Sequence, residues 1–179
     1  MILNNYYRFF EMLYKGDATG RSTKFVEPSG TEKIIRYRAG NTGYHDTVVL
    51  YRFGAYSGSL TSSGVVFGNG TIPPTVNDYT LSGERVTGLS AASSLQRIDE
   101  GDGKVAIICN WLITNNNENA VTIGEVAYLE SIGGYKPDST STLSGNFMVD
   151  RTVLDTPVTI PAGGVGQVTY TIRMNYPTV

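Results

Sequence analysis

The chain has 179 residues, of which 40% are hydrophobic and 17% charged, and its formal net charge is −2. This length suits one domain with its own core, and the lack of any basic run argues against nucleic acid or an anionic membrane surface as partner. The apolar stretches are far shorter than the roughly 20 residues of a membrane span, and the single Cys109 excludes an internal disulfide.

Residues 1–16 differ from the rest of the chain and are predicted to form a short N-terminal helix or arm. Asn4 or Asn5 is a suitable cap for this helix, and Gly16 is a suitable end. Aromatic side chains surround nearly the whole helix, so it must be buried, either on its own domain or on a neighbouring subunit. In the second case we expect the partner contacts to come from Tyr6, Tyr7, Arg8, Phe9, Phe10 and Tyr14.

Residues 16–31 are rich in Gly, Ser and Thr and are predicted to be a loop, and a β-sandwich domain is predicted over residues 30–179. Within that domain, apolar and β-branched runs are separated by Gly, Asn, Pro and Asp clusters, which indicates short strands. The strands are expected at 32–39, 46–53, 63–67, 84–98, 104–114, 119–130, 146–154 and 165–176, with a polar loop over 132–145.

Two of these strands carry the fold prediction. The last one alternates, with Val168 and Tyr170 between Thr169 and Thr171, which puts one face in a core and one in water. Residues 105–113 are instead apolar on both faces, as in a central strand covered on both sides, and the N-terminal helix or a partner is a candidate cover. Strands without intervening helices favour an all-β, antiparallel β-sandwich, jelly-roll or immunoglobulin-like, over a parallel α/β sheet.

Few side chains in the sequence suit catalysis or metal binding. His45 is the only histidine, its neighbour Asp46 points to the opposite face of an extended strand, and no G-x-S-x-G motif is present. Cys109 lies among apolar residues and is expected to act as a small apolar side chain. One His and one Cys cannot supply the usual zinc site, and the acidic segment 99–102 reads as a hairpin turn without EF-hand spacing. We therefore expect no catalytic residue, metal or cofactor.

Residues 65–84, VVFGNGTIPPTVNDYTLSGE, connect two predicted strands with an unusually specific sequence. The two adjacent prolines make the segment stiff and bar it from the interior of a sheet. Asp78 can tie a turn through its side chain, and Tyr79 and Leu81 are expected to re-enter the core. The segment is therefore predicted to carry the chain across the sandwich from one sheet edge to the other.

Three stretches resemble, in the same order, segments of the structural proteins of tailed bacteriophages and prophages. They are VVFGNGTIPPTVNDYTL (65–81), AVTIGEVAYLES (120–131) and RTVLDTPVTIPAGGVGQVTYTIRM (151–174). In those proteins the first holds a Gly-rich turn, the second usually reads I-x-E-[IV]-[GA]-L, and the third forms a closing hairpin around a Pro-Ala-Gly turn. Ala127 departs from the pattern, since Gly is commoner there. The resemblance covers about residues 48–176 and implies a virion component.

The expected function is that of a non-enzymatic structural protein of a tailed-phage virion, made in the host cytoplasm because no secretory signal is evident. We expect a capsid decoration or auxiliary head protein, with a neck, tail or baseplate component as the alternative. Its expected partners are other virion proteins and further copies of itself. Removing residues 1–15 is then expected to abolish assembly and leave the sandwich folded, whereas melting would place the helix in the core.

Two other functions remain open. A carbohydrate-binding or host-receptor-binding module would use aromatic side chains near strand ends, for which the candidates are Tyr44, Tyr51, Tyr56, Tyr79 and Tyr135. A glycan-cleaving hydrolase would need two converging carboxylates, which can assemble across a sheet from strands distant in sequence.

Overall fold

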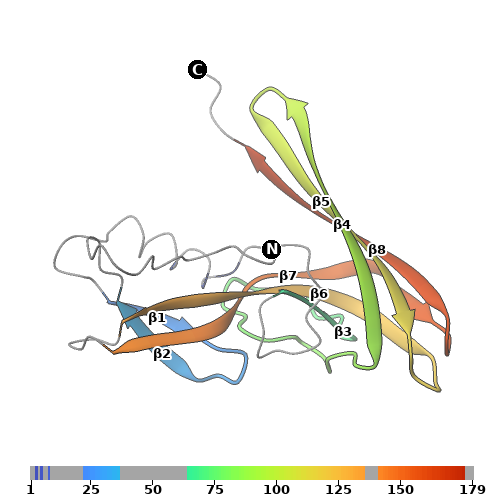
Figure 1. The fold of residues 1–179 in the computed structure, drawn as a ribbon, viewed down its shortest axis with the longest axis horizontal. Helices are drawn as coiled ribbons and strands as arrows, with labels where there is room; N and C mark the ends of the chain where they lie inside the picture. The colour runs from blue at the N-terminus through green and yellow to red at the C-terminus, as the bar shows by residue number, and fades with distance from the viewer. Residues whose placement is uncertain are drawn as a thin grey trace.

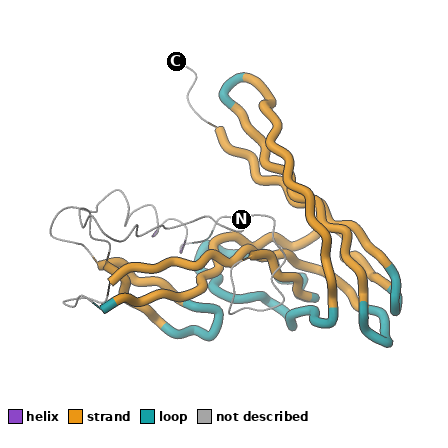
Figure 2. Tube along the Cα trace, in the orientation of Figure 1, coloured by secondary structure: helices purple, strands orange, loops and turns teal. Residues whose placement is uncertain are grey.

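The computed structural model describes Leu3, Asn5, Arg8 and residues 22–36, 64–135 and 141–175. Within this part the chain forms antiparallel strands joined by turns, which confirms the predicted all-β fold (Figure 1, Figure 2). The strand predicted at 46–53, His45, and most of the helix predicted at 1–16 lie outside the described residues.

The larger sheet is built around β6 (Val121–Tyr135). On one side, β6 pairs along its whole length with β7 (Thr142–Ile160). On the other side it pairs with β3 (Gly64–Gly68) and, at Tyr135, with β2 (Glu32–Arg36). The strand β1 (Ser22–Val26) pairs with β2 and ends the sheet among the described strands.

The smaller sheet has the order β4 (Leu89–Gly101), β5 (Lys104–Asn115) and β8 (Val165–Asn175). The position of β5 confirms that the run at 105–113 is a central strand. One end of this sheet packs on the larger sheet, whereas the β4–β5 hairpin and the end of β8 project away from it (Figure 1). The outer face of β5 is only partly covered, because Leu112 is 54% exposed.

The main core lies between the two sheets. Trp111 of β5 is fully buried, and its ring stands edge-on to Phe67 of β3 with ring centroids 5.9 Å apart. Tyr170 of β8 also packs against the indole, with ring centroids 6.2 Å apart. This cluster joins the sheets because it also contains Val65, Val86, Cys109, Ile113, Ile123, Val126, Tyr128, Val149, Ile160 and Val168.

Two segments predicted as loops are strands. The predicted loop 16–31 contains β1, and the predicted polar loop 132–145 is largely the continuation of β6 and the start of β7. These strands share a small core of their own, in which Phe25 and Phe147 pack with ring centroids 5.1 Å apart and with Ile35 and Ile132. Each strand supplies one of these four apolar residues, so the pattern is visible only after the strands are paired.

The stretch 151–174 does not form the expected hairpin. Its two strands belong to different sheets, since β7 pairs with β6 and β8 pairs with β5. The turn between them is a corner, closed by a hydrogen bond from Gly164 N–H to Pro161 O of 2.9 Å. Asn115, fully buried, holds this corner to the end of β5, with its Nδ2 3.1 Å from Ile160 O and 3.0 Å from Pro161 O.

Candidate functional site

The connector, residues 69–88, carries the chain from β3 in the larger sheet to β4 in the smaller one. This confirms the predicted crossing. Its two ends are held together, because Asn69 N–H donates to Glu84 O at 3.0 Å and Val86 N–H donates to Phe67 O at 2.8 Å. The Asn69 side chain completes the closure by accepting from Glu84 N–H at 2.8 Å. The connector is thus a closed loop that lies on the outer face of the larger sheet.

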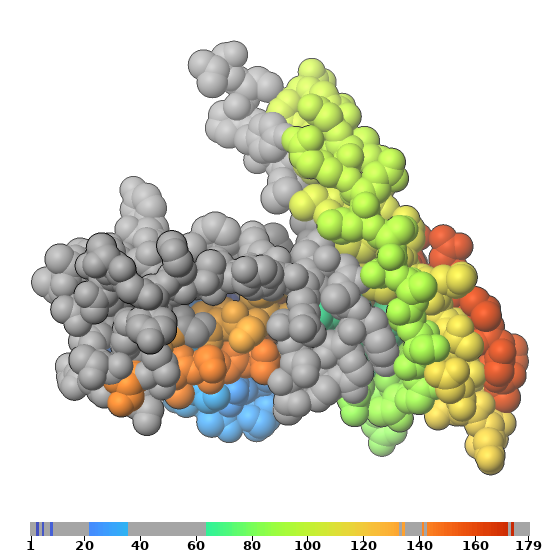
Figure 3. Space-filling view, in the orientation of Figure 1, coloured from blue at the N-terminus to red at the C-terminus, as the bar shows by residue number. Residues whose placement is uncertain are grey.

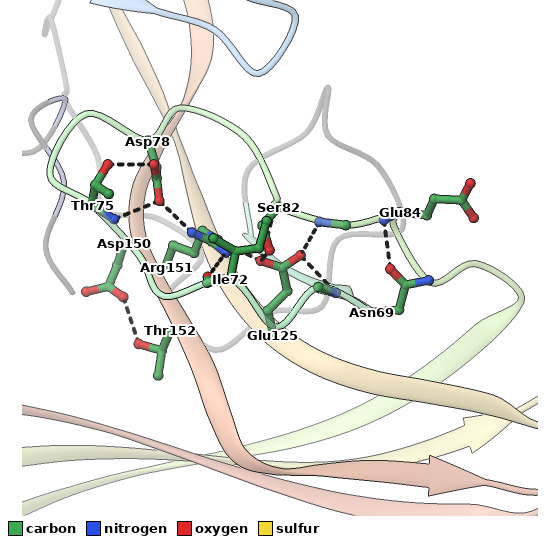
Figure 4. A network of polar contacts seen from close by, with 12 residues as sticks. Asn69, Ile72, Thr75, Asp78, Ser82, Glu84, Glu125, Asp150, Arg151 and Thr152 are labelled. Atoms are coloured by element: carbon green, nitrogen blue, oxygen red, sulfur yellow. Dashed lines mark hydrogen bonds and ion pairs between the residues drawn. The ribbon is translucent and has the colours of Figure 1, made fainter.

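Glu125 of β6 occupies the centre of that loop and is fully buried (Figure 4). Its Oε1 accepts hydrogen bonds from the backbone N–H of Gly70 at 3.2 Å and of Gly83 at 2.9 Å. Its Oε2 accepts from the Ser82 backbone N–H and hydroxyl, both at 3.1 Å. Backbone N–H groups from both ends of the loop therefore share one acceptor, the Glu125 carboxylate in the sheet below.

Arg151 of β7 neutralises Glu125 and extends the network to the far end of the loop. Its Nε donates to Glu125 Oε2 at 2.6 Å, its NH1 to Asp78 Oδ2 at 2.5 Å, and its NH2 to Ile72 O at 2.6 Å (Figure 4). The Arg151 side chain is buried, and a buried guanidinium is tolerated only when it is paired and hydrogen-bonded. We call residues 69–84 together with Glu125 and Arg151 the connector clamp.

Asp78 has the turn-forming role that the sequence predicts. Its carboxylate accepts from the Thr75 backbone N–H at 2.9 Å and from the Thr75 hydroxyl at 2.7 Å. Leu81 re-enters a core as predicted, being 7% exposed. The prediction for Tyr79 is wrong, because its side chain is 39% exposed and lies over Gly30 of the β1–β2 turn.

The electrostatics of the clamp keep both carboxyl groups ionised. Burial alone acts to raise the pKa of Glu125, but the Gly83 and Ser82 N–H groups and Arg151 outweigh it and lower that pKa. At Asp78, burial likewise acts to raise the pKa, and the hydrogen bonds from Thr75 and the Arg151 guanidinium lower it overall. The connector clamp therefore stabilises the ionised forms of Glu125 and Asp78.

Close packing explains the glycines of this region. A Cβ on Gly70 would lie 2.1 Å from Ser82 Oγ and 2.3 Å from Glu125 Oε1, and a Cβ on Gly83 would lie 2.5 Å from Gly70 N. Gly124 also touches the loop, since its Cβ would lie 2.6 Å from Gly70 O. Glycine is required at these positions by the approach of two backbones rather than by backbone conformation.

The described N-terminal residues dock beside the connector clamp on the same chain. Leu3 is fully buried with Val66, Leu81, Ala127, Leu129 and Met148, and its N–H donates to Val149 O at 2.9 Å. Asn5 Nδ2 donates to Val26 O at 2.9 Å and to Met148 O at 3.1 Å, so it links β1 to β7.

The residues expected to contact a partner are mostly outside the described part of the chain. This holds for Tyr6, Tyr7, Phe9, Phe10 and Tyr14. Arg8 is described, and its NH1 donates to Lys24 O of β1 at 3.2 Å. Of the aromatic residues considered for glycan binding, Tyr44, Tyr51 and Tyr56 are likewise outside the described residues, whereas Tyr79 is partly exposed and Tyr135 ends β6.

Two buried carboxylates lie on the inner face of the larger sheet. Glu130 of β6 and Asp150 of β7 are 2% and 7% exposed. The Tyr128 hydroxyl donates to Glu130, and the Tyr170 hydroxyl donates to Asp150. Burial, followed by the charge of Asp150, raises the pKa of Tyr170, so this hydroxyl stays a donor. The arrangement places both acids in the interior of the sandwich as acceptors for core tyrosines.

The other candidate groups occupy the positions expected of them. Cys109 is buried, and burial raises the pKa of its thiol to about 11, as for an apolar side chain in a core. The acidic segment 99–102 ends β4 and enters the β4–β5 hairpin turn at Asp102 and Gly103, and Asp99 accepts from Gly101 N–H at 3.0 Å. Among the described residues, no group of three or more His, Cys, Asp or Glu side chains is placed to hold a metal ion.

The sequence did not single out Glu125 or Arg151 as a pair. The available signal was weak: Arg151 is the one basic residue of β7, but both strands carry further carboxylates, Glu130 in β6 and Asp150 and Asp155 in β7, so the sequence does not show which acid pairs with it 26 positions away. Comparisons with protein families, with curated proteins and with solved structures gave no match. Among the described residues, no helix is both long and apolar enough to cross a membrane.

Proposed function

We propose that the protein is a non-enzymatic structural component of a tailed-phage particle that works by assembling with other virion proteins. The preferred role is capsid decoration or an auxiliary head protein, and a neck, tail or baseplate position is the alternative.

The observation that carries the proposal is the meeting of three sequence stretches in the connector clamp. The stretch 65–81 supplies Gly70 N–H, Ile72 O and Asp78, the stretch 120–131 supplies Glu125, and the stretch 151–174 supplies Arg151. These are the stretches that resemble phage structural proteins. Their contact supports the view that they form one architectural unit, since isolated likenesses on unrelated parts of a fold would not share a buried network.

The shape of the smaller sheet is the second support. The β4–β5 hairpin projects beyond the sandwich, and Leu95, Leu112 and Val165 of this sheet are each more than half exposed. Exposed apolar side chains on a projecting, weakly charged sheet are typical of a surface that contacts another protein.

Quantitative mass spectrometry of purified particles from the source phage or an induced lysate tests the proposal. A copy number close to that of the major capsid protein supports decoration of the head. A copy number close to that of the portal supports a neck or tail role. Absence from the particles contradicts the virion proposal altogether.

A further inference from the structure

The outer edge of β4 presents unusual properties for the edge of a sheet. Among the described residues, β4 pairs only with β5, so its other edge carries a row of backbone N–H and C=O groups outside any ladder. The strand has 13 residues, and all side chains from Ala92 to Arg97 are exposed. In the space-filling view its lime-green atoms run along the front of the molecule (Figure 3).

Natural proteins protect such edges with lysine, proline, bulges or very short strands. In β4 the residues 89–96, LSAASSLQ, contain neither charge nor proline, and the register shift occurs only near the end, between Asp99 and Gly101. Leu95 is 57% exposed in the middle of the strand. A long edge strand that is uncharged over its first eight residues is a template for a further strand.

We propose that this edge binds the β4 strand of a second copy of the chain, antiparallel, across a two-fold axis at Leu95. The inference rests on the assembly role proposed above and names one homotypic contact for it. Leu95 is the midpoint of Leu89–Gly101, so this axis pairs the whole strand with its mate and joins two three-stranded sheets into one of six strands.

The charges of β4 favour this register. All of them lie in the second half of the strand, at Arg97, Asp99 and Glu100. In the antiparallel register these residues lie opposite small uncharged residues in the first half of the partner strand, and Leu95 lies opposite its own copy. An in-register parallel pairing would instead put each charge beside its own copy, which is unfavourable. The charge distribution therefore selects the two-fold arrangement over the parallel one.

A charge-swap experiment at the axis tests the contact. The intact chain is expected to form a dimer in sedimentation analysis, and Leu95→Lys and Leu95→Glu are each expected to raise its dissociation constant more than about tenfold, because like charges then face each other. Mixing the two variants is expected to restore dimers as a heterodimer. Leu112→Lys is the matched control, since Leu112 is 54% exposed in the same sheet but lies on β5, and it should leave the dimer unchanged.

Hydrogen exchange provides the second readout, with protection of the backbone of 89–101 expected in the intact chain and lost in Leu95→Lys. A chain that stays monomeric at high concentration overturns the proposal. So does a dimer that resists both Leu95 variants or dissociates in Leu112→Lys. These outcomes are separate from the particle measurement: a chain present in particles but monomeric alone keeps the proposed function and rejects this contact.

Discussion

The connector clamp and the outer edge of β4 both contain backbone polar groups that lie outside the sheet ladders, but the two regions differ in whether those groups are buried and hydrogen-bonded within the chain. In the clamp, the backbone donors Gly70, Ser82 and Gly83 converge on a carboxylate with no exposed surface. Along β4, the exposed side chains leave one edge of the strand accessible. Buried polar groups need hydrogen-bond partners within the chain, whereas exposed ones can form hydrogen bonds to water or to another protein. The comparison teaches that the first region specifies the fold, and the second is the region that we propose for assembly.

The largest expected effect is at Arg151. Arg151→Met removes the positive charge and leaves Glu125 buried without its ion-pair partner, so unfolding free energy should fall by about 3–5 kcal/mol. Urea denaturation measures this loss. Arg173→Met is the matched control, because the Arg173 side chain is 64% exposed and its pair with Glu100 should contribute less than about 1 kcal/mol. Equal losses in both variants would contradict the importance of the clamp.

Leu3 tests whether the N-terminal segment belongs to the folded domain. Leu3→Ala should destabilise the chain by about 2–4 kcal/mol, because it opens a cavity against Val66, Leu81 and Met148 of the same chain. Thermal and urea unfolding of the monomer give the value. A loss under about 0.5 kcal/mol would mean that the segment is detached in solution, and the alternative of an arm on a neighbouring subunit would then gain support.

Gly70 tests the close approach of the loop to Glu125. Gly70→Ala places a methyl group 2.1 Å from Ser82 Oγ and 2.5 Å from the backbone nitrogen of Gly83, so the loop must shift, at a cost of about 2–3 kcal/mol. Gly163→Ala is a useful comparison, since its Cβ would meet nothing within 4 Å and only its positive φ costs about 1 kcal/mol. The urea midpoints of the two variants should therefore differ, and the reverse order would contradict the packing argument.

How far the sequence predicts this molecule depends on whether the signal is local. The alternation of Val168 and Tyr170 and the apolar run ending at Ile113 identify β8 and the central strand β5 correctly. The strand β1 is missed because it contributes a single large apolar residue, Phe25, to a core shared by four strands, and the start of β7 is missed because residues 142–145 are mostly small and polar. Such a core has no periodicity within any one segment.

The clamp itself was only half predictable. The turn at Asp78 follows from the local turn-forming preference of aspartate, whereas the closure of Asn69 on Glu84 joins residues 15 positions apart. The pairing of Glu125 with Arg151 depends on the register between β6 and β7, which includes two irregularities, and no short segment encodes it. Tyr79 shows the opposite error, because an aromatic residue in a loop was assigned to the core and instead covers Gly30.

The connector clamp is expected to make the unfolding free energy depend on pH, because it contains two ionised carboxylates. The pKa values of Glu125 and Asp78 are lowered in the folded chain, so their contribution is complete above their unfolded pKa values, near 4, and is lost as pH falls through the folded values. Unfolding free energy should therefore decrease from pH 5 toward pH 2. Asp78→Asn should flatten this decrease, as measured by urea midpoints across the range, and an unchanged slope would show that Asp78 does not contribute.

The smallest effect is expected on β4, and it completes the comparison. Gln96→Lys adds a charge to an exposed side chain on the free edge, so the stability of the monomer should change by no more than about 0.5 kcal/mol. The measurement is urea unfolding at a protein concentration low enough to keep the chain monomeric, because any loss of a dimer contact would otherwise enter the result. A loss of several kcal/mol would mean that β4 is covered within a single chain. The edge would then resemble the clamp, and its availability to a second copy would be refuted.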